Sequence, residues 1–210
     1  MYHKLQYISQ GNTSDEHIKN IKEALVAGCL WIQLRMKNSS AEEIENTANE
    51  VRLLCNTYNA IFILNDNVAI AKNTNADGVH LGLTDMPVIK AREILGNDKI
   101  IGGTANSIND VLQRINEKCN YIGLGPFRFT STKDKLSPIL GLEGYKQIIS
   151  KLNTSQQQTP IYAIGGVLPG DVEAIMQTTI YGIAVSGIIT CADNKKEMVE
   201  QFKNILYANA

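Results

Sequence analysis

Residues 30–65 read LWIQLRMKNSSAEEIENTANEVRLLCNTYNAIFILN and contain the pattern that decides the fold. Two apolar runs, 30–35 and 60–65, are rich in β-branched and aromatic residues, and a longer stretch of helical period separates them. A helix between two such runs is typical of a βαβ unit, in which the strands lie parallel. Ser40 fits the N-cap of this helix, because its side-chain oxygen can accept free backbone N–H groups. The region therefore predicts strand, helix and strand.

The same pattern recurs about eight times along the chain. The predicted strands are Leu5–Ser9, Leu30–Arg35, Ala60–Asn65, Gly78–Leu81, Ile100–Gly103, Tyr121–Gly125, Ile161–Ile164 and Gly182–Val185. A helix candidate follows each strand, and Ser14 and Ser107 are further candidate N-caps. Eight parallel strands with eight crossover helices close into a (β/α)8 TIM barrel, so we predict this α/β fold as a single domain over residues 1–210. An open doubly wound sheet is the alternative.

The composition argues against several classes of partner. The chain has a formal net charge of −1 with intermixed acidic and basic residues, so it offers no broad basic surface to nucleic acid or to an anionic membrane. No apolar run approaches the roughly 20 residues that span a bilayer, and the start lacks the apolar core of a signal peptide. We therefore expect a soluble cytoplasmic protein. Its dispersed cysteines disfavour a zinc cluster and are expected to be buried thiols; they are Cys29, Cys55, Cys119 and Cys191.

Cationic side chains follow the second predicted strand. Strand alternation puts Trp31, Gln33 and Arg35 on one face, so Gln33 and Arg35 are expected to point into the mouth of the barrel, and Lys37 extends from the next loop. Catalytic residues of TIM barrels gather at these carboxyl ends of the strands. Arginine binds phosphate oxygens in a bidentate manner and lysine adds a mobile charge. We predict a pyrophosphate site here, with a solvated strand end as the alternative.

Two carboxylates end the third and fourth predicted strands. Asp66 follows Asn65, and Asp85 lies shortly after the next strand. Because these strands are neighbours in a barrel, both carboxylates can reach one Mg²⁺, which prefers hard oxygen ligands and keeps several waters. Alternatively, both aspartates are helix N-caps, since each precedes a helical segment and Pro87 supplies a helix-start proline.

A second phosphate site is predicted on the other side of the barrel mouth. Gly165-Gly166 and Ser186-Gly187 end strands seven and eight, where barrel enzymes often bind phosphate through backbone N–H groups. A simple tight turn is the alternative. The long polar segment 128–140 after strand six carries Thr130, Thr132 and Lys133. Its length favours a functional loop, and we hypothesise that it closes over substrate.

None of the three histidines has a convincing catalytic partner in the sequence. His80 lies inside a predicted strand and is expected to be a packed, hydrogen-bonded residue. His17 falls in the first helix and is expected to be exposed. His3 lies near the start of the chain. Acid–base chemistry by histidine is therefore not indicated.

Taken together, these motifs resemble the thiamine phosphate synthase family, (β/α)8 enzymes of thiamine biosynthesis. The motifs that carry the resemblance are QLRMK at 33–37, Asn65-Asp66, DGVHLG at 77–82 with DMP at 85–87, Ile101-Gly102, YIGLGP at 121–126, TSTK at 130–133, AIGG at 163–166 and Val185-Ser186. Their order and spacing extend over nearly the whole chain. The family is a transferase family that joins 4-amino-5-hydroxymethyl-2-methylpyrimidine diphosphate to a thiazole phosphate, giving thiamine phosphate and pyrophosphate. Its chemistry is dissociative: pyrophosphate leaves first, and the thiazole nitrogen attacks a pyrimidine-stabilised carbocation.

The resemblance implies a role for each matching residue. The pyrimidine diphosphate would contact Gln33, Arg35, Lys37, Asn65 and Lys133. The thiazole phosphate would contact Thr130, Thr132, Gly166, Val185 and Ser186. Asp66 and Asp85 would bind Mg²⁺, and Arg35, Lys37 and Lys133 would be catalytic because they stabilise the leaving group.

Three positions depart from the family pattern. Thr84 replaces the usual Gln, and Asn106 replaces the usual His. Thr104 replaces Ser but keeps a hydroxyl, so it stays among the substrate-binding residues. The alternatives are a thiazole tautomerase, which works by proton transfer, and a non-catalytic paralogue that binds thiazole phosphate. The resemblance implies small-molecule substrates, without nucleic acid or membrane, and leaves a homo-oligomer open.

Overall fold

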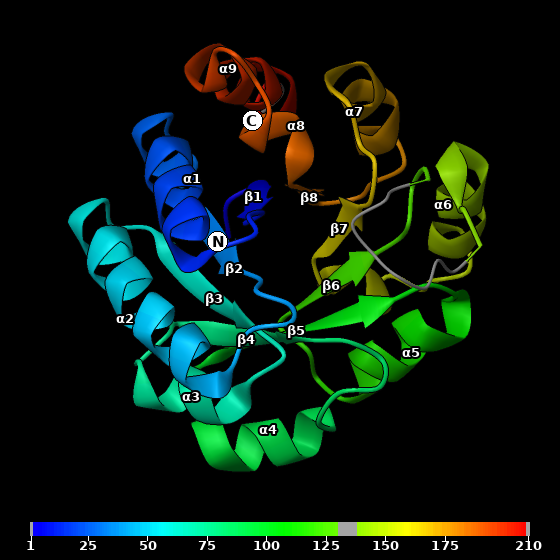
Figure 1. Cartoon of the computed structure of the whole chain (residues 1–210). Coiled ribbons are helices and arrows are strands. Elements are labelled where there is room, and N and C mark those ends of the chain that lie inside the picture. The colour runs from blue at the N-terminus through cyan, green and yellow to red at the C-terminus, as the bar shows by residue number, and fades with distance from the viewer. Residues whose placement is uncertain (1, 130–137, 209–210) are drawn as a thin grey trace.

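The computed structural model describes residues 2–129 and 138–208, which form a closed barrel of parallel strands in the order β1 to β8 (Figure 1). The strands are β1 (Leu5–Ile8), β2 (Trp31–Leu34), β3 (Ile61–Asn65), β4 (Gly78–Leu81), β5 (Ile100–Ala105), β6 (Tyr121–Leu124), β7 (Ile161–Ile164) and β8 (Gly182–Val185). The barrel closes because β1 pairs with β8, with Leu5 opposite Ile183. The predicted TIM barrel is confirmed, and the open doubly wound sheet was wrong.

Helices surround the barrel on its outside (Figure 1). They are α1 (Ser14–Val26), α2 (Ala41–Thr57), α3 (Val68–Asn73), α4 (Val88–Leu95), α5 (Ile108–Asn116), α6 (Gly141–Ile149), the 3-10 turn η1 (Gln156–Gln158), α7 (Pro169–Met176), α8 (Gly187–Thr190) and α9 (Lys195–Leu206). Ser40 and Ser107 are N-caps, as predicted. The cap of α1 is Thr13 instead of Ser14, because Thr13 has the extended backbone and accepts from the Glu16 N–H.

Aromatic side chains fill the amino-terminal half of the barrel, which we call the floor. Trp31, Ile63, Tyr121 and Tyr162 are fully buried there and pack together. The strand faces that point outward pack against the helices in the larger core. Because the floor is closed by these rings, open space inside the barrel lies at the carboxyl ends of the strands.

Three of the four cysteines are buried, as expected, whereas Cys191 is exposed. Cys191 is the C-cap that follows the four-residue helix α8. Among the residues that the structure describes, no helix combines the length and the apolar character needed to cross a bilayer.

Candidate functional site

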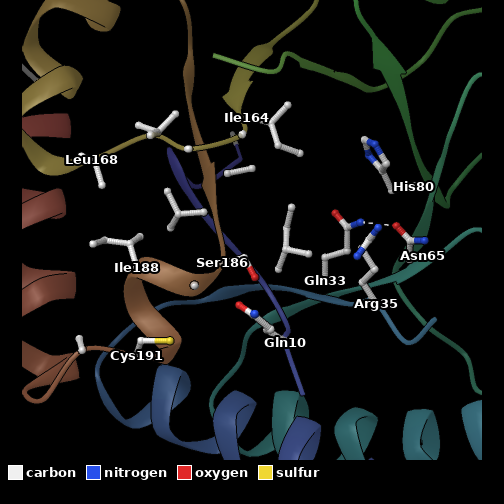
Figure 2. Close-up of a pocket in the computed structure, with 18 of the residues that line it drawn as sticks. Gln10, Gln33, Arg35, Asn65, His80, Ile164, Leu168, Ser186, Ile188 and Cys191 are labelled. Atoms are coloured by element: carbon white, nitrogen blue, oxygen red, sulfur yellow. Dashed lines mark hydrogen bonds between the residues drawn. The ribbon is translucent and has the colours of Figure 1, made fainter. Parts of the chain in front are cut away.

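A cavity of about 680 Å³ opens at the carboxyl ends of the strands, at the end we call the mouth (Figure 2). One side is formed by residues of β2 to β5 and by Arg35, which follows β2; the strand residues include Gln33, Asn65, His80 and Thr104. The turns after β7 and β8 form the other side, with Gly165, Gly166, Ser186 and the first residues of α8. In Figure 2, Gln33, Arg35 and Asn65 group together, and Leu168, Ile188 and Cys191 lie across the cavity from them. A charged and amide-rich wall therefore faces a more apolar wall.

Gln33 is buried at the charged wall, and one of its polar atoms is unpaired. Its Nε2 donates to Asn65 Oδ1 at 2.7 Å, whereas its Oε1 is buried and has no hydrogen-bond partner within residues 2–129 and 138–208. On the opposite wall, the buried Ser186 Oγ likewise has no partner in these ranges. Burying an unpaired polar atom costs about 1–3 kcal/mol. Both residues line the cavity, so a ligand that reaches these atoms would offset that cost.

Asp66 and Asp85 lie against each other at the edge of this wall. Their carboxyl groups share a hydrogen bond. The pKa of Asp66 is raised to about 7, mainly because the group loses contact with water and secondly because Asp85 lies beside it. The positive charges of Arg35 and Lys37 act in the opposite direction on the same group. Two carboxyl groups and two cations from three different strand ends therefore interact electrostatically in this region.

Neither aspartate caps a helix. The cap of α3 is Asn67, whose Oδ1 accepts from the Ile70 N–H at 3.1 Å, and the cap position of α4 is Pro87. Asp66 has a left-handed backbone with φ of 62°, a conformation that costs a non-glycine residue free energy and often marks a functional site. Asp85 Oδ2 accepts from the Gly82 N–H at 2.6 Å. The N-cap alternative for these two residues is therefore wrong.

The turn after β7 requires its two glycines. Gly165 and Gly166 have φ of +91° and +70°, in the left-handed region that glycine alone adopts without strain. A Cβ on Gly166 would also lie 2.9 Å from the Arg128 Cβ. The Arg128 guanidinium donates to the Gly166 carbonyl at 2.7 Å and to both Asp171 carboxylate oxygens at 2.8 and 2.9 Å. This ion pair fixes the turn against the start of α7.

Comparison with known proteins shows the family of this chain. The sequence profile of the thiamine monophosphate synthase family matches residues 5–189. The chain belongs to this family. The thiamine-phosphate synthase of Flavobacterium johnsoniae is 55% identical over 100% of this chain and 99% of its own length, and that of Bacteroides fragilis is 46% identical over 96% and 98%. Among solved structures, the thiamine phosphate pyrophosphorylase of Pyrococcus furiosus is 29% identical, has a TM-score of 0.83, and aligns over 98% of this chain and 96% of its own.

The structure brings together most residues that the family resemblance singles out. Gln33, Arg35, Asn65, Thr104, Gly166, Val185 and Ser186 all line the one cavity. Lys37 lies close enough to Asp66 to lower its pKa. Thr130, Thr132 and Lys133 lie outside the described residues, as does most of the segment 128–140 that was expected to close over substrate. Asn106 donates through its side-chain amide to the Gly125 carbonyl and so links the ends of β5 and β6.

The burial of one histidine differs from the prediction. His80 is buried and hydrogen-bonded, as expected. His17 was expected to be exposed, but it is buried, because the first turn of α1 packs over the end of β1. Its Nδ1 lies 2.8 Å from Ser9 Oγ, and this oxygen also accepts from the Arg35 backbone N–H at 3.0 Å. His17 and Ser9 therefore support the backbone of Arg35.

Proposed function

We propose that this chain catalyses the condensation of 4-amino-5-hydroxymethyl-2-methylpyrimidine diphosphate with thiazole phosphate, which gives thiamine phosphate and pyrophosphate. The observation that carries the proposal is that Asp66 interacts with Asp85, Arg35 and Lys37 beside the cavity that Arg35 and Asn65 line. Relatives at 46% to 55% identity over nearly their full length, named thiamine-phosphate synthase, support the same conclusion. The proposal assigns small-molecule substrates in the cytoplasm, and neither nucleic acid nor a membrane as partner.

The aspartate pair fits Mg²⁺. Two carboxyl groups that share a hydrogen bond repel each other when both are ionised, as the raised pKa of Asp66 reflects. A divalent cation between them would remove that repulsion. Within the described part of the chain, no cluster of three or more His, Cys, Asp or Glu residues forms a larger metal site, and Mg²⁺ commonly uses one or two carboxylates together with waters and substrate phosphates. When bound, the ion supplies charge that stabilises a leaving pyrophosphate.

The protein's own cations would complete that stabilisation. As the C–O bond of the pyrimidine diphosphate breaks, its electron pair stays on the pyrophosphate oxygen. Arg35 and Lys37, together with Lys133, would bind the resulting negative charge. Removing one preorganised charge-stabilising contact costs roughly 10²- to 10³-fold in rate. No general base is needed for this step, in agreement with the packed and hydrogen-bonded surroundings of His80 and His17.

The other wall would hold the thiazole phosphate. Gly165, Gly166, Val185 and Ser186 line the cavity, and Ser186 Oγ is buried without a partner among the described residues. Thr130 and Thr132 would add hydroxyls to the same phosphate. The thiazole nitrogen would then attack the carbocation across the cavity and form the new C–N bond.

Product formation tests the proposal against its two alternatives. Purified protein is given both substrates with Mg²⁺, and thiamine phosphate is quantified by chromatography. A synthase forms thiamine phosphate only when both substrates are present. Rearrangement of the thiazole phosphate alone would instead identify a tautomerase, and binding of thiazole phosphate without any turnover would identify a non-catalytic paralogue.

A further inference from the structure

A chain of hydrogen bonds crosses the inside of the barrel beneath the cavity. Gln6 Nε2 of β1 donates to the Tyr121 hydroxyl of β6 at 3.2 Å. The same hydroxyl lies 3.0 Å from Nδ1 of His80 on β4, and His80 Nε2 lies 3.0 Å from Thr104 Oγ1 on β5. All four side chains are buried, but His80 and Thr104 also line the cavity. This row of hydrogen bonds therefore connects the floor of the barrel to the wall of the site.

Two glycines leave the space that this chain occupies. A Cβ on Gly102 would lie 2.2 Å from Cζ of Tyr121, and a Cβ on Gly123 would lie 3.1 Å from Cε1 of His80. Both glycines point into the barrel from the strands that border these rings. Neither has a positive φ, so available volume, and not backbone conformation, explains why glycine fits these positions. The barrel interior is shaped around the phenol and the imidazole.

The direction of each hydrogen bond follows from its neighbour. Burial raises the pKa of Tyr121 far above its usual range, so its hydroxyl stays protonated. This hydroxyl accepts from Gln6 Nε2, and among residues 2–129 and 138–208 the acceptor within reach of its own proton is His80 Nδ1, so the proton is directed there. An imidazole that accepts at Nδ1 carries its proton on Nε2. That proton is donated to Thr104 Oγ1, which leaves the threonine's own hydrogen pointing away from His80.

We propose that Tyr121 and His80 are positioning residues that fix the Thr104 hydroxyl as a hydrogen-bond donor toward the cavity, and thereby select a ligand with an unprotonated ring nitrogen at that point. Gln33 Oε1, a buried acceptor of the same wall without a partner in residues 2–129 and 138–208, supplies the complementary group. One donor and one acceptor match a ring nitrogen beside an amino group, which is the edge of an aminopyrimidine. The selectivity rests on the proposed function, whereas the hydrogen-bond direction does not.

The first experiment determines the tautomer of His80 in the ligand-free protein. The chain has three histidines, so the imidazole ¹⁵N signals of His80 can be assigned by their loss in His80→Gln. We expect the wild type to show a single neutral tautomer with the proton on Nε2. A proton on Nδ1 would reverse both hydrogen bonds of His80 and overturn the proposal.

Tyr121→Phe should remove this tautomer preference, because the ring stays in its space while the donor to Nδ1 is lost. Tyr162→Phe is the matched control. Tyr162 packs on Tyr121 with ring centroids 5.6 Å apart. Its hydroxyl donates to the His3 carbonyl at 2.8 Å and takes no part in the hydrogen bonds that link Tyr121, His80 and Thr104. The control should keep the wild-type His80 spectrum. Unchanged His80 signals in Tyr121→Phe would contradict the proposal.

The second experiment measures binding of the pyrimidine diphosphate by calorimetry in a double-mutant cycle. One hydrogen bond corresponds to about a three- to tenfold change in affinity, so we expect a loss of this size in Tyr121→Phe and in Thr104→Val. Thr104→Ser should retain wild-type affinity. Because Tyr121 acts through the Thr104 hydroxyl, the double variant should bind no more weakly than Thr104→Val alone.

Additive losses in the double variant would show that Tyr121 contributes only structurally and would overturn the positioning role. If the wild type itself does not bind the pyrimidine diphosphate, the proposed function fails and the inferred selectivity fails with it. The tautomer experiment still decides the direction of the hydrogen-bond chain in that case, because it uses the protein without ligand.

Discussion

At the floor of the barrel, Trp31, Tyr121 and Tyr162 pack with ring centroids 5.0 to 5.6 Å apart, away from the cavity, although Trp31 Nε1 has no hydrogen-bond partner among the described residues. At the mouth, the buried polar atoms without such partners belong to Gln33 and Ser186, which line the cavity. The two regions belong to the same strands: Trp31 and Gln33 are alternate residues of β2. Floor side chains gain stability by filling space. Mouth side chains give up stability, since their interactions await a ligand. Substitutions should therefore separate stability from activity according to the end of the barrel they affect.

Trp31→Ala should produce the largest effect and should act on stability. Removing a large buried aromatic side chain costs about 3–5 kcal/mol of unfolding free energy, and Trp31 is fully buried among rings. Urea denaturation measures this loss. The kcat per folded molecule should stay close to wild type, because Trp31 points toward the floor. A kcat that falls together with the stability would contradict the idea that floor residues affect stability and mouth residues affect activity.

Asp66→Asn should have nearly as large an effect, but on activity. We expect a roughly 10²- to 10³-fold lower kcat, by analogy with the loss of other charge-stabilising groups. The melting temperature should stay equal or rise, because the substitution removes one of two mutually repelling carboxylates and asparagine tolerates the left-handed backbone. Steady-state kinetics and thermal denaturation check both parts.

Asp77→Asn is the matched control for Asp66→Asn. Asp77 Oδ2 accepts from Arg52 Nη1 at 2.8 Å and from the Phe62 N–H at 2.7 Å, before β4 begins. Its loss should lower stability and leave kcat unchanged. The comparison fails if both aspartates behave alike.

Gly166→Ala should have an intermediate effect that is confined to one wall of the mouth. A left-handed backbone costs a residue with a side chain about 1–2 kcal/mol, and the added Cβ would press on Arg128. We expect the KM for thiazole phosphate to rise roughly tenfold, with a smaller change for the pyrimidine diphosphate. Gly170→Ala is the control, since its Cβ would meet nothing within 4 Å. Equal changes in both KM values would argue against two separate phosphate sites.

The smallest effect concerns His17, behind the mouth. Burial lowers the pKa of His17 from its usual 6.5. Below pH 6.5 the unfolded chain therefore takes up a proton that the folded chain does not, so this contribution to stability is complete above pH 6.5 and declines as the pH falls below it. His17→Gln should flatten the pH dependence of unfolding free energy between pH 7.5 and 5.5. Burial is also the main cause that lowers the pKa of His3. Part of the pH dependence of the unfolding free energy should therefore persist in His17→Gln. An unaltered slope in the variant would contradict the role given to His17.

The sequence predicts the strands well because each is a short run of buried, β-branched or aromatic residues bounded by polar ones. Gly78–Leu81, Ile161–Ile164 and Gly182–Val185 coincide with β4, β7 and β8. The alternation in β2 likewise predicts that Gln33 and Arg35 face the cavity, as they do. Local pattern suffices wherever one strand or one helix cap decides the outcome.

Sequence reasoning was weaker where distant segments meet. The pairing of Ser9 with His17 depends on how α1 packs over β1, and no periodicity signals it. The hydrogen bonds of His80 to Tyr121 and Thr104 join three different strands, so the polar residue in an apolar strand was the only hint. Rejecting the N-cap alternative for Asp66 needed the position of Asn67 in the turn.

Pyrophosphate release from the pyrimidine diphosphate and thiazole phosphate, followed while Mg²⁺ is titrated, tests most directly whether the mouth is a site for a metal-bound pyrophosphate. We predict release that rises with Mg²⁺, stops with EDTA, yields thiamine phosphate in equal amount, and is lost in Asp66→Asn but not in Asp77→Asn. Release that continues undiminished in EDTA, or equal rates in wild type and Asp66→Asn, would contradict this account.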